Sequence, residues 1–254
     1  MIIIIILIKE RRTIMKENNL LKIFKIKKKL TSNKAYLLLT NDSIKERDDF
    51  FKPENKWILH SAYVGMAARR IAFKLNLDYD LAASLGYIHD IGRKFNHNNH
   101  PIEGYNYLLK LGYLNEARIC LTHSFIDNDI NLTAGGGPKD SKTYEFINDF
   151  LINNPVNIYD NIVQLCDLFC LETGFTTIEK RILDITNRKG IFDNSKEHLI
   201  KAIELKERIE ELLGYSIYCL FPEINKDDLK NAEKDKEDIL NLLEINKNKN
   251  KKLK

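Results

Sequence analysis

Apolar residues recur at helical spacing along most of the chain, and stretches of strict alternation are few. The clearest stripe follows Trp57 and consists of Leu59, Tyr63, Met66, Ala67, Ile71 and Leu75. The same spacing predicts further helices over residues 142–152, 156–172, 175–189, 194–213 and 226–244. Residues 35–39 could form a short strand, but we predict a helix there. The pattern as a whole predicts an all-α fold.

Residues with strong positional preferences mark the helices between positions 78 and 112. Asp78 or Asp80 suits the N-cap of a helix that ends near Gly92. Proline is well tolerated in the first turn of a helix, so Pro101 indicates that the next helix begins there and runs to Gly112.

A polar loop interrupts the helical pattern in the middle of the chain. Asn115 suits the cap of a helix through residues 119–125, and residues 127–141 then contain three consecutive glycines and a proline. These residues cannot continue a helix, and a loop of this length is often functional. Lys139 is therefore a candidate contact for a substrate, or part of a lid. A plain flexible connection is the alternative.

The domain organisation follows from these elements. We expect a single helical domain over residues 31–220 and a charged helix with a basic tail over 221–254. We expect residues 1–30 to form a poorly ordered basic leader. The apolar run 1–8 is too short to span a bilayer, which needs about 20 residues. A short interfacial anchor and a start at Met15 are alternatives, and we predict no membrane span.

Charge is distributed unevenly along the chain. The net charge is +4, but residues 1–30 carry +7 and residues 245–254 carry +5, which leaves −8 for the rest. This excludes a basic nucleic-acid-binding domain, so we do not expect nucleic acid as the partner. The four cysteines form no Cys-x-x-Cys pair, which favours buried thiols in a reducing, cytoplasmic compartment.

Histidines are concentrated in one part of the chain. Five of the six lie between positions 60 and 123, namely His60, His89, His97, His100 and His123. A single histidine on an apolar helix face is usually a hydrogen-bonded core residue. Several histidines that point into one core need partners, and a metal ion satisfies them together. His97 lies in a polar loop, and we interpret it as a rim residue.

Two aspartates lie among apolar neighbours. Asp90 follows His89 directly and Asp167 lies in an apolar helical run. A buried carboxylate is costly unless it is paired or bound to a cation, so both are candidate ligands. Asp160 precedes a more polar stretch, and we expect it to be solvated.

These residues occur in segments that resemble the HD superfamily, whose members are all-helical, metal-dependent phosphohydrolases. The resemblance covers about residues 57–190. It rests on the ordered His, His-Asp, His, His, Asp pattern, on the glycine after the His-Asp pair, and on the segments 57–61 (WILHS), 86–93 (GYIHDIGR), 100–104 (HPIEG), 122–124 (THS), 165–167 (LCD) and 174–181 (GFTTIEKR). It implies a single HD-type helical domain with additional C-terminal helices.

The resemblance also implies a ligand set. A first metal ion would be held by His60, His89, Asp90 and Asp167, and a second by the two further histidines, His100 and His123. Such pairs occur in diadenosine tetraphosphate hydrolases and cyclic-dinucleotide phosphodiesterases. The latter usually have paired histidines where this chain has His123-Ser124, which argues against a cyclic dinucleotide and leaves one or two ions open. Imidazole and carboxylate ligands suit Fe, Mn, Zn, Co or Ni.

Basic residues near the His-Asp pair are candidates for contacting phosphate. Arg93 and Lys94 follow Asp90 closely, and a guanidinium group suits bidentate contact with phosphate. An ion pair between Arg93 and a nearby acid is the alternative. The charged triplet Glu179, Lys180, Arg181 is typical of a solvated helix face, and the sequence assigns it no role.

The function expected from the resemblance is metal-dependent phosphohydrolysis. A metal-activated water would cleave a phosphoester or phosphoanhydride of a nucleotide or another small phosphorylated molecule. Asp90, Arg93 and Lys94 would serve catalysis, and Arg93, Lys94 and Lys139 would bind substrate. Whether the enzyme is a phosphomonoesterase, a phosphodiesterase or a pyrophosphohydrolase is not resolved, nor is its oligomeric state. The alternatives are a non-catalytic nucleotide-sensing or regulatory module, and a nucleic-acid phosphodiesterase that uses the basic ends.

Overall fold

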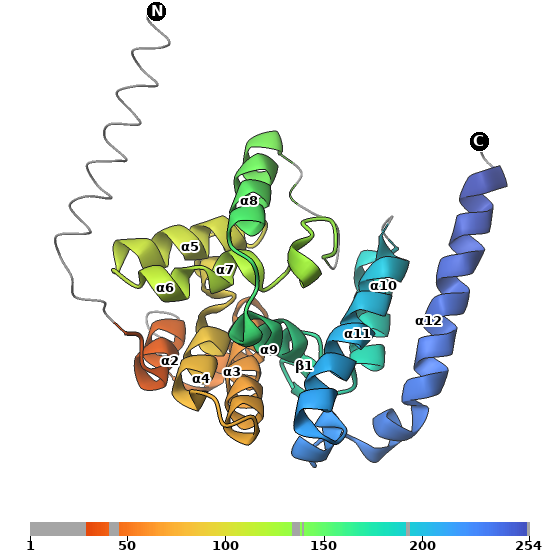
Figure 1. Ribbon diagram of the computed structural model, residues 1–254, viewed down its shortest axis with the longest axis horizontal. Helices are drawn as coiled ribbons and strands as arrows, with labels where there is room; N and C mark the ends of the chain where they lie inside the picture. Colours follow the sequence, from red (N-terminus) through yellow and green to blue (C-terminus); the bar gives the residue numbers. More distant parts are fainter. Residues whose placement is uncertain (1–28, 41–45, 134–137, 139, 192–193, 253–254) are drawn as a thin grey trace, which may run out of the picture.

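The computed structural model describes residues 29–40, 46–133, 138, 140–191 and 194–252 (Figure 1). Over this part of the chain the fold is predominantly α-helical, as predicted. The α-helices are α2 (Ser32–Thr40), α3 (Lys56–Lys74), α4 (Tyr79–Ile88), α5 (His100–Lys110), α6 (Leu114–Ala117), α7 (Ile119–Thr122), α8 (Ser141–Asn153), α9 (Ile158–Asp167), α10 (Ile178–Lys189), α11 (Ser195–Leu213) and α12 (Lys226–Lys252). Short 3₁₀ helices cover Arg47–Phe51, Pro53–Asn55, Ile91–Lys94, Ile126–Asn128 and Ile217–Leu220.

The centre of the molecule is formed by α3, which packs against α4 on one side and α9 on another (Figure 1). Val64, Ile71 and Ile88 are fully buried in this core. A Cβ atom on Gly86 would lie 2.6 Å from the Cα of Gly65, so only glycine permits this close approach of α3 and α4. Met66 is 39% exposed, so the buried face of α3 is rotated from the predicted stripe.

The predicted helix boundaries between 78 and 112 are confirmed to within a few residues. The side chain of Asp78 accepts a hydrogen bond from the backbone N–H of Leu81 and caps α4, and Pro101 lies in the first turn of α5. The next boundary was wrong. Tyr113, not Asn115, precedes α6, and two four-residue helices, α6 and α7, replace the single predicted helix.

The helix predicted over residues 156–172 ends earlier than expected. Helix α9 stops at Asp167, and an antiparallel hairpin follows, in which β1 (Cys170–Leu171) pairs with β2 (Gly174–Phe175). Gly174, the first residue of β2, has a φ of 141°, which residues with a side chain rarely adopt, so glycine suits the turn into this strand. Asp167 therefore lies at the end of a helix, beside the hairpin.

The C-terminal helices form the edge of the molecule. Helix α12 packs mainly against α10, and its residues Ile239 and Leu243 are buried (Figure 1). Its backbone is helical to Lys252, so it continues into the segment that we had predicted as a tail. Within the described residues, no helix has the length and apolarity that crossing a membrane requires.

Several sequence-based expectations lie outside the described residues. These are the apolar run 1–8, the start at Met15, and Lys139 in the glycine-containing loop. The last two residues of the expected leader are described. Lys29 forms an ion pair with Asp78, and Leu30 is fully buried. These two residues therefore contact the helical part of the chain.

Candidate metal centre

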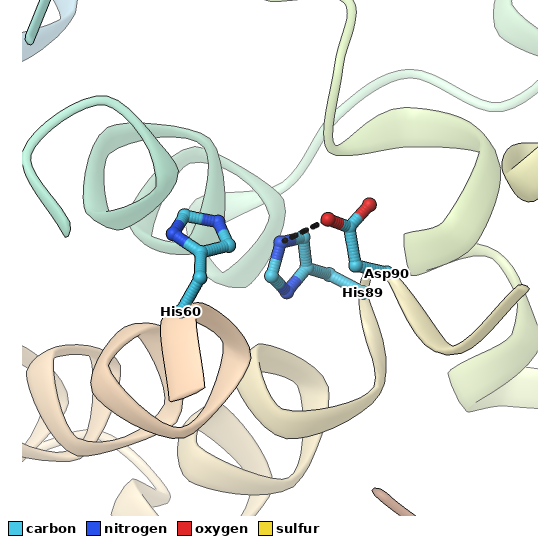
Figure 2. Close-up of side chains that lie close together, drawn as sticks. All are labelled: His60, His89 and Asp90. Carbon is cyan, nitrogen blue, oxygen red and sulfur yellow. Dashed lines mark ion pairs between the residues drawn. The ribbon is translucent and has the colours of Figure 1, made fainter. Parts of the chain in front are cut away.

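The six side chains that the sequence predicted as metal ligands come from five parts of the fold. His60 lies on α3, and His89 and Asp90 follow the end of α4. Figure 2 shows that the rings of His60 and His89 approach each other and that Asp90 lies beside His89. The others are the first residue of α5, the residue after α7 and the last residue of α9, namely His100, His123 and Asp167.

The structure brings all six together. Three overlapping sets of three side chains each have ligand atoms within 4.8 Å of one another: His60, His89 and Asp90; His89, His123 and Asp167; and Asp90, His100 and His123. His89 is fully buried, and the side chain of Asp167 is 29% exposed. These groups could hold a metal ion, with Asp167 on the solvent side.

Each of the four histidines has its Nδ1 atom next to a backbone carbonyl. The partners are Cys170 for His60 (3.1 Å), Gly86 for His89 (2.7 Å), His97 for His100 (3.0 Å) and Ile119 for His123 (3.0 Å). A carbonyl oxygen only accepts, so Nδ1 must be the donor in each case. In a neutral ring this leaves the lone pair on Nε2, which is the arrangement typical of metal-binding histidines.

The Nε2 atoms face carboxylate oxygens. His60 Nε2 lies 2.8 Å from Asp167 Oδ1, and His100 Nε2 lies 3.1 Å from Asp90 Oδ1. His123 Nε2 is 3.5 Å from Asp90 Oδ1, and His89 Nε2 lies 3.8 Å from Asp90 Oδ2 and 3.9 Å from Asp167 Oδ1. A neutral Nε2 and a carboxylate both accept hydrogen bonds, so this arrangement needs protonated rings or a shared cation.

Burial decides against protonating two of these rings. Burial lowers the pKa of His89 to about 4, although the charges of Asp90 and Asp167 act in the opposite direction. Burial also lowers the pKa of His100. Both rings are therefore neutral near pH 7, which favours a cation between the nitrogens and the carboxylates.

Three buried atoms in the cluster have no hydrogen-bond partner among the described residues. They are Nε2 of His89, Nε2 of His100 and Oδ1 of Asp90. An unsatisfied buried polar group costs about 1–3 kcal/mol, and native proteins rarely place three together without a reason. A metal ion would satisfy all three, and mixed nitrogen and oxygen ligands suit a divalent transition metal. The donor set therefore fits a metal, without identifying which.

Arg93 forms a hydrogen-bonded ion pair with one of the candidate ligands. Its Nε donates a short hydrogen bond to Asp90 Oδ2. Burial raises the pKa of Asp90, but its polar neighbours, above all the charge of Arg93, bring it well below its ordinary value. Asp90 is therefore ionised, with one oxygen held by Arg93 and the other facing His100 and His123.

A glycine allows the start of α5 to reach this centre. A Cβ atom on Gly92 would overlap the carbonyl oxygen of His100 and would lie only 2.5 Å from the backbone nitrogen of Gly104. The glycine after the His-Asp pair therefore has a packing role, because any side chain would push His100 away from Asp90.

The cluster opens into a cavity of about 880 Å³, which is large enough for a small-molecule ligand. His60, Asp90, His100, His123 and Asp167 form part of its lining. Apolar, polar and charged side chains form the rest, and the apolar and basic ones include Trp57, Leu168, Ile185, Arg93, Arg181 and Arg188.

The other residues considered in the sequence analysis differ in whether they line the cavity. His97 is exposed and lies in the cavity lining, in agreement with a rim position. Arg93 lines the cavity, but Lys94 is not among the lining residues. The prediction that Asp160 is solvated is wrong, because Asp160 is only 1% exposed and accepts hydrogen bonds from Arg118 and Thr122. Its partners lie about 40 positions away, so the local sequence did not reveal the burial.

Two residues that the sequence analysis did not select also face this cavity. His198 on α11 is 4% exposed, and burial lowers its pKa to about 4 against the opposing charge of Asp167. Gln164 lies one turn before Asp167 on α9, and its Nε2 donates to the carbonyls of Thr122 and Phe125 on either side of His123. The spacing of Gln164 from Asp167 could have indicated a shared face, whereas His198 had no such signal.

Comparisons with protein-family models, with curated proteins and with solved structures find no match to this chain. The case for a metal centre therefore rests on the residues and their geometry.

Proposed function

We propose that this protein is a metal-dependent phosphohydrolase of the HD type, acting on a nucleotide or another small phosphorylated molecule. The observation that carries the proposal is the orientation of four histidines, each with Nδ1 on a backbone carbonyl and Nε2 directed at Asp90 or Asp167. The cavity beside them supports a small-molecule substrate.

The residues that would hold a first ion are His60, His89, Asp90 and Asp167. His100 and His123 would hold a second ion together with Asp90, because their Nε2 atoms face the same oxygen of that carboxylate. When bound, a divalent ion in such a site polarises a phosphoryl oxygen and lowers the pKa of water.

Two further side chains would orient the candidate ligands or contact the substrate. Arg93 fixes the orientation of Asp90 through Nε, and its position in the cavity lining lets its other nitrogens contact a substrate phosphate. Ser124 Oγ lies 2.8 Å from His123 Nε2 and can donate a hydrogen bond to it. In the proposal this serine holds His123 in place until a stronger partner binds there.

The test begins with protein purified without chelator and analysed for bound metal. Hydrolysis of a panel of nucleotides and simple phosphate esters is then measured with Mn, Fe, Co, Ni and Zn. We expect bound metal and turnover, and loss of both in His89→Ala. Arg208→Gln is the matched control, because Arg208 pairs with Asp127 and does not line the cavity.

Two outcomes would contradict the proposal. If the protein binds no metal and hydrolyses no compound of the panel, the proposed phosphohydrolase activity is excluded. Metal and nucleotide binding without any hydrolysis would instead support a sensing or regulatory module with the same centre.

A further inference from the structure

A second group of charged residues, distinct from the His/Asp cluster, lines the same cavity. Three cationic side chains take part: Lys56 at the start of α3, and Arg181 and Arg188 on α10. Two carboxylates pair with them, that of Glu172, which also lines the cavity, and that of Asp184, which does not. These five side chains together carry one more positive charge than negative charge.

The two carboxylates pair mainly with Lys56 and Arg188. Lys56 pairs with Glu172 at 3.2 Å. Arg188 makes three hydrogen bonds to Asp184, at 2.7–3.1 Å. Arg181 makes one long hydrogen bond of 3.3 Å to Asp184, and its Nε is buried without a hydrogen-bond partner among the described residues. The surplus positive charge therefore belongs to Arg181.

Arg181 is also held in place more firmly than a surface arginine. Its side chain is only 14% exposed, and its neighbours Ile178 and Ile182 are buried in the core. The preceding residues of the triplet point elsewhere. Glu179 is buried and accepts a hydrogen bond from Tyr218 Oη, and Lys180 pairs with Asp228. The expectation of a solvated triplet was therefore wrong for Glu179 and Arg181.

A guanidinium that is largely removed from water and incompletely paired favours an anion. We propose that Arg181 is the centre of a second anion-binding subsite, which holds an anionic group of the substrate other than the one that reacts at the His/Asp cluster. The substrate class is then a nucleotide or similar molecule with at least two anionic groups, such as a nucleoside diphosphate. This inference rests on the proposed function for the reacting group only.

The shape and lining of the cavity agree with such a molecule. Its volume of about 880 Å³ far exceeds what a single phosphate fills, and it contains the apolar side chains of Trp57, Leu168 and Ile185. These could contact the uncharged part of a ligand whose anionic groups bind at the His/Asp cluster and at Arg181.

The first experiment measures binding without hydrolysis. Calorimetric titration of metal-free protein with adenosine diphosphate and with adenosine compares wild type, Arg181→Gln, Arg181→Lys and the control Arg208→Gln. We expect Arg181→Gln to weaken adenosine diphosphate binding about tenfold or more, because a charge-assisted contact is lost. Arg181→Lys should lose less, and neither change should affect adenosine. Equal diphosphate affinity in wild type and Arg181→Gln, or no diphosphate binding by wild type, would overturn the subsite.

The second experiment uses the metal-loaded protein and two substrates. We expect Arg181→Gln to raise KM for adenosine diphosphate about tenfold and to leave KM for p-nitrophenyl phosphate, which has one anionic group, unchanged. An equal rise for both substrates would overturn the assignment of Arg181 to a second group. If wild type hydrolyses neither substrate, the wider panel decides the proposed function, and the binding titration decides the subsite independently. If Arg181→Gln does not fold, Arg181→Lys provides the same comparison.

Discussion

Two acidic centres at opposite ends of α9 differ in one respect, the kind of atom that faces the carboxylate. Asp160, in the first turn, is surrounded by donors: Arg118 at 2.7 Å, Thr122 at 2.8 Å and the backbone N–H of Asn157 at 2.8 Å. Asp167, at the last residue, faces Nε2 of His60 and His89, which are acceptors when the rings are neutral.

The difference separates a structural network from a binding site. A buried carboxylate whose oxygens are all paired with donors stabilises a fold and needs nothing further. A carboxylate that faces other acceptors is complete only with a cation. Asp167 is more exposed than Asp160, but burial alone does not distinguish the two kinds of carboxylate, because Asp90 in the His/Asp cluster is 3% exposed and Asp160 is 1% exposed.

The largest expected effect comes from neutralising a carboxylate of the metal centre. Asp90→Asn and Asp167→Asn should each lower turnover by about a thousandfold, because each removes a ligand charge from the site. For Asp167→Asn the unfolding free energy of the chelated protein should stay the same or rise, because acceptors that face one another are removed. Asp90→Asn should lower it, because that change also breaks the ion pair with Arg93. Turnover and chemical denaturation measure the effects. Intact turnover in both variants would show that these carboxylates do not form a site.

The converse substitution at the other end of the helix should affect stability instead. Asp160→Ala leaves Arg118 without its carboxylate, and breaking a buried ion pair in this way costs about 3–5 kcal/mol. Chemical denaturation measures the loss, and metal analysis of the folded protein should show unchanged metal content. A stable variant that had lost its metal would reverse the two assignments.

A smaller effect is expected from the pH dependence of stability at His198. Its pKa is about 4 in the folded state and about 6.5 when unfolded, so the unfolded chain binds the proton more readily. The contribution of His198 to the free energy of unfolding is therefore constant above about pH 6.5. It is lost as pH falls towards 4, and the loss is at most about 3 kcal/mol. Denaturation of wild type and His198→Gln between pH 7 and 4 should diverge accordingly, and parallel curves would contradict the prediction.

The smallest effect should follow removal of the cap of α9. Asn157 accepts hydrogen bonds from the backbone N–H groups of Tyr159 and Asp160, and Asn157→Ala should cost about 1 kcal/mol. Metal content and turnover should not change, because Asp167 lies at the other end of the helix. A thermal melt together with a turnover assay tests both statements. Loss of metal would show that the two ends are coupled.

Local pattern predicted much of this fold because the signals for a helix lie within one or two turns. The spacing of apolar residues and the cap at Asp78 needed no information from the rest of the chain. The end of α9 was missed because its apolar run continues beyond Asp167, while the hairpin depends on pairing between Cys170 and Phe175.

Most of the candidate ligands were predictable for a different reason, and the resemblance to the HD superfamily supplied His100. Histidines and aspartates on apolar faces need partners, so their residue type carries the information even when their distances do not. The residue type of an arginine carries less information about its partners. Only the competition of Arg181 and Arg188 for Asp184 distinguishes Arg181 from a solvated charge, and that competition appears only in three dimensions.

The placement of the ligands within their helices has a consequence for how quickly an ion could exchange. His89, Asp90, His100, His123 and Asp167 all lie at or just beyond a helix end, and His60 lies inside α3. Terminal turns open at much lower free energy than helix interiors. In the proposed centre, entry and release of an ion would therefore need only the fraying of single turns, with His60 as the last point of attachment. Residence time would then follow local opening, and a chelator would strip the centre long before the core unfolds.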